Sequence, residues 1–203
     1  MSANSQTITF EEGRLLLAYL LKGNNDNPAN YKQLRNYTIT LLMLHAGLRV
    51  GEVVKLELRD LVFNGDPVKA VTMRAATTKT KTERTVPLSI LLQSAIASII
   101  KAIPDGDGLA STWSVFTGSN NKTALTVRQV ERIIKAASLA AFGRAITPHV
   151  LRHTFATRLM KVLDIRGVQT LLGHKHLSST QIYTHPDADS LKSAIETVTQ
   201  HSA

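Results

Sequence analysis

Apolar residues recur at helical spacing over most of the chain, beginning near Thr7. The first helix should start at Phe10, because Thr9 can cap it and the two glutamates after Phe10 favour the positive end of a helix. Glycine, asparagine and proline residues over 23–28 end this helix. The same reasoning predicts helices over 31–44, from about 49, and over 90–103, 126–141, 148–162, 165–172, 178–183 and 189–199.

Residues 60–85 depart from the helical pattern. A largely apolar stretch over 68–73 and a second segment over 84–86 flank a polar connector rich in threonine and lysine, and Pro87 closes the region. Such a pattern is typical of a β-hairpin. We therefore predict a mainly α fold with a small antiparallel β-sheet, of the α+β class.

The composition narrows the class of protein. Of the 203 residues, 43% are hydrophobic and 19% are charged, which suits a single domain over 1–203, with a core of about 7–186 and a tail helix of about 187–200. No apolar run approaches the roughly 20 residues of a membrane helix, and the first residues lack a signal-peptide layout, so we expect a cytoplasmic protein. The absence of cysteine excludes disulfides, thiolate zinc sites and cysteine nucleophiles.

The chain is strongly basic. It has 24 Lys and Arg residues against 15 Asp and Glu residues, a formal net charge of +9. This excess is typical of proteins that bind nucleic acids. Ribosome-associated proteins, membrane-surface proteins and ordinary basic enzymes share it, so the charge alone leaves these classes open.

Two histidines and an arginine gather at the start of the helix predicted from Pro148. With Thr147 as its N-cap, His149, Arg152 and His153 fall within an arc of about 100°. Such a face near a positive helix end suits an anion, above all a phosphate. The histidine spacing also fits zinc, but valine stands where metalloprotease helices have glutamate, and the arginine would repel a cation. Surface and capping roles are the remaining alternative.

Three other groups of candidate site residues each have both a structural and a functional interpretation when taken alone. Arg49 and Glu52 can form an ordinary (i, i+3) ion pair, or Glu52 can orient Arg49 toward two phosphate oxygens. Lys79 or Lys81 can be a solvated lysine or a proton donor on the hairpin. Tyr183 has by default the role of a packed aromatic residue with its hydroxyl at the rim.

Taken together and in this order, these segments resemble the tyrosine recombinase, or phage integrase, family, most closely its Xer-like members. The matching segments are Gly47-Leu48-Arg49-Val50-Gly51-Glu52, Lys79 with Glu83-Arg84-Thr85-Val86-Pro87-Leu88, His149-Val150-Leu151-Arg152-His153, and Leu172-Gly173-His174 with Ile182-Tyr183-Thr184-His185. The step of nine residues from His174 to Tyr183 is also the family's. The resemblance covers nearly the whole catalytic domain.

The resemblance implies a site-specific DNA recombinase, or integrase, that cleaves and rejoins strands through a covalent 3′-phosphotyrosine. Tyr183 is then the nucleophile, and the other catalytic residues are Arg49, Lys79, His149, Arg152 and His174. No cofactor, metal or ATP is implied.

Further residues receive supporting roles from the same resemblance. Glu52 and His153 would support the catalytic groups. DNA contacts are expected from Lys79, Lys81, Arg84 and Lys175. Counting back from Glu83 favours Lys79 over Lys81 as the proton donor.

The N-terminal end of the chain departs from the family's pattern. The family usually has an N-terminal helical domain that closes over the other side of the DNA, and here the catalytic domain begins almost at Met1. We expect a naturally short recombinase or a fragment, from a prokaryotic, phage or mobile-element context and associated with the nucleoid. The protein would bind double-stranded DNA and no membrane. It would be a monomer or weak oligomer when free and a tetramer on paired DNA sites. The alternatives are a type IB topoisomerase and a non-catalytic DNA-binding protein.

Overall fold

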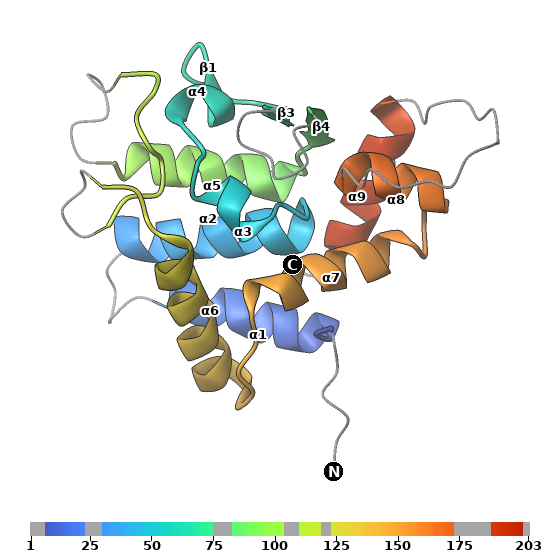
Figure 1. Cartoon of the computed structure of the whole chain (residues 1–203), viewed down its shortest axis with the longest axis horizontal. Coiled ribbons are helices and arrows are strands. Elements are labelled where there is room, and N and C mark those ends of the chain that lie inside the picture. The colour runs from blue at the N-terminus through green and yellow to red at the C-terminus, as the bar shows by residue number, and fades with distance from the viewer. Residues whose placement is uncertain are drawn as a thin grey trace.

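The computed structural model describes residues 7–22, 30–74, 83–103, 110–118, 123–172 and 188–200 (Figure 1). Its helices are α1 (Phe10–Leu21), α2 (Tyr31–His45), α3 (Val50–Val53), α4 (Leu58–Leu61), α5 (Ile90–Lys101), α6 (Val127–Phe142), α7 (Pro148–Leu159), α8 (Ile165–Leu172) and α9 (Ala188–Gln200). Its strands are β1 (Val62–Phe63), β2 (Asp66–Pro67), β3 (Ala70–Met73) and β4 (Arg84–Pro87). The prediction of a mainly helical fold with small antiparallel strand pairs is confirmed.

The central element of the core is α2. Its residues from Thr38 to His45 are all buried, as is typical of a helix surrounded by other elements. α5 packs on one side of α2 and α1 on the other, while α7 contacts it as well (Figure 1). Each fully buried Leu or Ile side chain of α2 stabilises the fold by about 1.5–3 kcal/mol. The end of α2 is therefore a rigid support for the turn that follows it.

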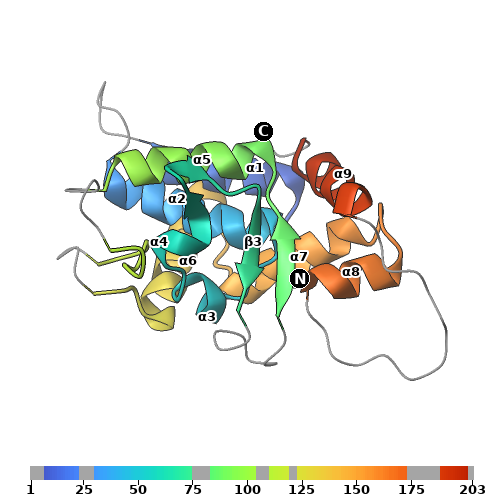
Figure 2. The same cartoon turned by 90° about the horizontal axis from the view of Figure 1, so that it is seen from above.

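The predicted hairpin is formed by β3 and β4. The two strands are antiparallel, with Val71 opposite Val86 and Met73 opposite Arg84, and they lie side by side in Figure 2. All four of these residues are buried. Because side chains alternate along a strand, the residues between them face solvent. The connector that carries Lys79 and Lys81 lies outside the described residues.

Three short elements were not predicted. α4 precedes a tight hairpin of β1 and β2, whose turn residues Asn64 and Gly65 have φ angles of 51° and 86°. Positive φ at both central residues is the geometry of a two-residue hairpin turn. Elements of two to four residues are too short to show a periodic pattern, which is why the sequence did not indicate them.

The predicted helix ends agree with the observed ones to within a few residues. The main difference is α7, which ends at Leu159 rather than at residue 162, because Asp164 caps α8 close behind it with a 2.8 Å hydrogen bond from the Gly167 N–H. The helix predicted over 178–183 lies outside the described residues. Within the described part of the chain, no helix has both the length and the apolar character needed to cross a membrane.

One buried side chain of α2 is costly to the fold. His45 is fully buried, and neither ring nitrogen has a hydrogen-bond partner among the described residues. Burial, together with repulsion from the charge of Arg158, lowers its pKa from 6.5 to about 3. Below pH 6.5 the unfolded chain therefore binds a proton at this histidine that the folded chain does not, so stability is lost as the pH falls.

We predict that His45→Leu removes this pH dependence. Between pH 7 and pH 5 the wild type should lose about 2 kcal/mol of unfolding free energy that the variant keeps, at about 1.4 kcal/mol per pH unit below pH 6.5. Urea denaturation of both proteins at several pH values measures the difference. Parallel curves over this range would contradict a depressed pKa at His45.

Candidate active site

The turn between α2 and α3 depends on a glycine. Gly47 has a φ of +62°, and a Cβ added there would lie 2.4 Å from Cδ1 of Phe155 on α7 and 3.0 Å from Cδ2 of Leu172 on α8. Only glycine allows both this backbone conformation and this close approach. α7 and α8 therefore pack directly against this turn, two residues before Arg49, which is the N-cap of α3.

Arg152 crosses from α7 to this turn. Its Nη1 donates to the Gly47 carbonyl and its Nη2 donates to the Leu172 carbonyl at 2.9 Å. The residue is only 8% exposed. Burial lowers its pKa to about 9, with the nearby charge of Arg49 acting in the same direction and that of Glu52 opposing it. At neutral pH the guanidinium stays charged, and its two carbonyl partners fix its orientation.

Glu52 of α3 holds two arginines with one carboxylate. Its oxygens accept from the Arg49 backbone N–H at 2.7 Å and from Arg49 Nη1 at 3.0 Å. They also accept from Arg84 Nη1 at 2.9 Å and Arg84 Nη2 at 2.7 Å, a two-pronged pair that joins α3 to β4. Only 2% of the Glu52 side chain is exposed.

Glu52 is ionised in this setting. Burial is the largest influence on its pKa and would raise it, but the hydrogen bonds from Arg84 and Arg49, together with the charge of Arg84, outweigh burial and bring the pKa below 4.5. Since the folded-state pKa is depressed, this carboxylate stabilises the fold above pH 4.5 and loses that contribution as the pH falls through its folded-state pKa.

These four residues form what we call the arginine cluster: Arg49, Glu52, Arg84 and Arg152. The cluster brings three positive charges together against one negative charge. Arg84 and Arg152 are buried, whereas the Arg49 side chain is 26% exposed and opens the cluster to solvent. A surplus of guanidinium charge in a partly buried place favours binding of an anion with several oxygens.

The two histidines of α7 lie in the first turns of the helix, as predicted. Their rings are stacked, with centroids 6.4 Å apart and an angle of 7° between the planes. His149 is exposed and His153 is half-buried. Thr147 takes the N-cap position but makes no capping bond with its side chain. Arg152 does not share the histidines' exposure, because its side chain reaches inward to the turn at Gly47.

The structure thus brings together Arg49 and Arg152, which the sequence had named as catalytic residues, and Glu52, which it had named as a supporting residue. It also adds Arg84, for which we expected a DNA contact. That expectation does not agree with its burial, since its guanidinium binds Glu52 and the Leu171 carbonyl at 3.0 Å. The alternation of β4 carried a signal for this, because Arg84 lies on the same side of the strand as the buried Val86.

The other predicted site residues lie outside the described part of the chain. They are Lys79, Lys81, His174, Lys175 and Tyr183. Their roles remain predictions from the motifs that contain them.

We predict that Glu52→Gln lowers the unfolding free energy by about 3–5 kcal/mol, because it leaves the buried Arg84 without an anion. The double variant Glu52→Gln/Arg84→Met should recover most of this loss. Glu57→Gln is the matched control, since Glu57 pairs with arginines near the surface and should cost at most about 1 kcal/mol. Denaturant titrations measure all three, and equal losses in Glu52→Gln and Glu57→Gln would refute the assignment.

Comparison with known proteins identifies relatives over most of the chain. Tyrosine recombinase XerA of Pyrococcus furiosus is 36% identical over 165 residues, which cover 81% of this chain and 54% of that protein. Tyrosine recombinase XerC of Rhodospirillum centenum is 35% identical, with 81% of this chain and 46% of that protein covered. The chain spans about half the length of the curated relatives it matches.

Solved structures share the fold. The crystal structure of XerA recombinase superposes with a TM-score of 0.67 at 28% identity, covering 97% of this chain and 65% of that chain. The integrase from mycobacterium phage Brujita superposes with a TM-score of 0.68 at 23% identity, covering 98% and 59%, and shows the fold alone. The sequence profile of the Phage integrase family matches residues 6–190. The chain therefore belongs to the phage integrase family, the tyrosine recombinases, and is similar to its Xer members.

Proposed function

We propose that this chain is the catalytic domain of a site-specific recombinase, which cleaves and rejoins the strands of double-stranded DNA through a covalent 3′-phosphotyrosine. The observation that carries the proposal is the arginine cluster, in which Arg49 and Arg152 meet with a surplus of positive charge. A phosphodiester under attack gathers negative charge on its non-bridging oxygens, and two guanidiniums can compensate this charge without metal or ATP.

The cluster is preorganised for this task. Arg152 is held by two main-chain carbonyls, and Arg49 is held by Glu52, which Arg84 holds in turn. Because these contacts exist before DNA binds, little reorganisation is needed when charge develops on the phosphate. His149 is exposed on α7, three residues before Arg152, and can donate to a phosphate oxygen, while the stacked ring of His153 supports it.

The covalent step is assigned through the family's motifs. The hydroxyl oxygen of Tyr183 attacks phosphorus, a P–O bond to tyrosine forms, and the bond to the 5′ oxygen breaks. Lys79, or Lys81 in its place, donates a proton to the departing 5′ oxygen. His174 or His149 accepts the proton of the tyrosine hydroxyl. The phosphotyrosine keeps the energy of the broken linkage, so a 5′ hydroxyl can reverse the step.

DNA as the partner is supported by the relatives. Among the solved structures with this fold are XerH recombinase bound to its difH substrate and the Tn1549 transposon integrase in complex with transposon right end DNA. For this chain we propose duplex DNA, a monomer or weak oligomer when free, and a tetramer on paired sites, in the cytoplasm at the nucleoid. A free monomer is supported by α9, whose buried apolar side chains pack within the same chain against α7, β4 and α2. No observation favours a topoisomerase or a non-catalytic protein.

We predict that the chain captures DNA covalently from a pool of nicked suicide duplexes with randomised sequence, in the presence of EDTA. An SDS-resistant protein–DNA species should form with the wild type, and sequencing the attached DNA would identify the target. Tyr183→Phe should form none while still binding duplex DNA, because it lacks only the attacking oxygen. An adduct formed equally by Tyr183→Phe would overturn the choice of nucleophile.

The two arginines should behave differently when each is replaced by alanine. Arg49→Ala should slow single-turnover cleavage by about 10²–10³-fold with little change in thermal stability, since Arg49 is partly exposed. Arg152→Ala should slow cleavage and also lower the Tm, because its guanidinium ties α7 to the Gly47 turn and to α8. Arg59→Ala, at an exposed arginine of α4, serves as the control and should change neither quantity. Equal Tm losses in the first two variants would contradict this division.

A further inference from the structure

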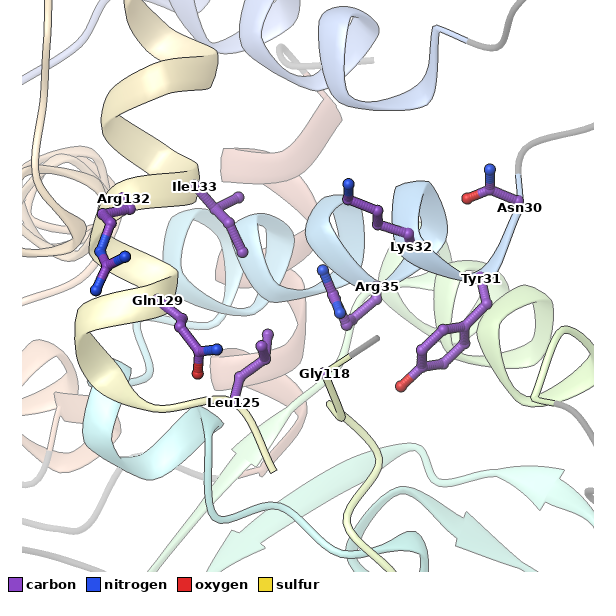
Figure 3. Close-up of a pocket in the computed structure, with 9 residues that line it drawn as sticks. All are labelled: Asn30, Tyr31, Lys32, Arg35, Gly118, Leu125, Gln129, Arg132 and Ile133. Carbon is purple, nitrogen blue, oxygen red and sulfur yellow. The ribbon is translucent and has the colours of Figure 1, made fainter. Parts of the chain in front are cut away.

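An apolar groove, which we call the α1–α6 groove, lies between the outer side of α1 and the end of α6. Its volume is about 490 Å³, and it is lined by the α1 residues from Leu15 to Lys22 that face outward and by Ala140 and Ala141 of α6. The two helices pack against each other (Figure 1). The start of α6 is different, since Gln129 extends there into a separate, basic cavity (Figure 3). Among the described residues that line the α1–α6 groove, only Lys22 carries a charge.

The outer side of α1 is a continuous stripe of exposed residues. Between residues 11 and 22 the exposed members are Glu11, Arg14, Leu15, Ala18, Tyr19 and Lys22. They recur at steps of one and three, so they lie on one face of the helix. Leu15 is 38% exposed and Tyr19 is 44% exposed, and charged residues stand at both ends of the stripe. An exposed apolar surface with a charged rim is typical of a contact between proteins.

The charges of this stripe are complementary to those of a second copy of the same stripe. Glu11 lies in the first turn of α1 and Lys22 is its C-cap residue. When a second α1 lies antiparallel across the first, with a two-fold axis halfway between these residues, Glu11 of each copy meets Lys22 of the other. Glu11 already accepts from Arg14 of its own helix at 2.7 Å, and its carboxylate has further acceptor positions for an ammonium. The contact therefore contains the same ion pair twice.

The middle of the stripe is complementary in shape about the same axis. Leu15 of one copy meets Ala18 of the other, because both residues are equally far from the axis along the chain. Ala18 and Ala140 are small and leave the groove open, so a leucine can insert there as side chains do between packed helices. Arg14 likewise meets Tyr19, on whose ring a guanidinium can stack.

We propose that the α1–α6 groove binds α1 of a second copy of this chain, in an antiparallel contact with two-fold symmetry. A helix of 12 residues is about 18 Å long, so the contact is small and the dimer is weak. The residues of the arginine cluster belong to α3 with its N-cap, to β4 and to α7, so pairing through α1 leaves them outside the contact. Such a dimer is a property of the free protein and does not depend on DNA cleavage.

The test exchanges the charges at the two ends of the stripe. Sedimentation equilibrium over about 10 µM to 1 mM protein measures the dimer Kd of each variant. Glu11→Lys and Lys22→Glu each place like charges opposite one another twice, and each should weaken the dimer by about 5–30-fold. The double variant Glu11→Lys/Lys22→Glu brings opposite charges together again, and its Kd should return to within about 3-fold of the wild type.

Matched controls have the same changes of net charge at exposed positions outside the stripe. They are Glu131→Lys on α6 and Lys101→Glu on α5, and each should leave the Kd within about 2-fold of the wild type. Leu15→Gln tests the apolar middle of the contact. It removes a leucine from both halves of the dimer and should weaken it by at least about 10-fold. The Tm of every variant shows that it is folded.

Three results would overturn the proposal. A wild type that stays monomeric at about 1 mM would leave the groove to a different protein. A dimer that is unchanged in Leu15→Gln would form through another surface. A double charge variant that dimerises no better than the single variants would exclude the antiparallel arrangement. These measurements use no DNA, so their outcome is separate from that of adduct formation.

Discussion

The carboxylate of Glu52 joins the start of α3 to β4 and, through Arg84, to the end of α8. It binds the backbone and side chain of Arg49 at the start of α3 and, with both oxygens, the guanidinium of Arg84 on β4. Arg84 then donates to the end of α8. A buried carboxylate is unfavourable unless it is paired, and this one is paired twice. Its position therefore determines where the hairpin, the α2–α3 turn and α8 lie relative to one another.

Buried guanidiniums serve as cross-links throughout the described part of the chain. Arg84 and Arg152 donate to carbonyls at the end of α8, Arg35 donates to Thr117 and Arg158 donates to Thr9 at 3.1 Å. Each bond joins segments that are distant in sequence, apart from the shorter step between α7 and α8. Carbonyl partners satisfy the donors without cancelling the charge. The fold thus brings positive charges together while it satisfies hydrogen bonds, and the proposed phosphate site at the arginine cluster follows from this arrangement.

Much of the fold could be predicted, because most helices of this chain are long enough to show the helical spacing of apolar residues. The N-cap at Thr9 and the helix stop before Gly47 were visible as local signals. The same holds for the polar connector between two short segments, which predicted the hairpin of β3 and β4. Elements as short as α4 and the pair β1–β2 escaped prediction, since two to four residues contain no repeat.

For the site, the sequence was sufficient to select residue types and spacings, because these are local properties. It named Arg49, Glu52 and Arg152 before any geometry was known. It could not show that Glu52 also binds Arg84, because Arg84 lies 32 residues away from Glu52. Nor could it show that Arg35 is buried with its guanidinium on the Thr117 carbonyl, which depends on packing between α2 and the segment at Thr117. Burial and charge balance are sums over neighbours in space, and only the tertiary structure brings those neighbours together.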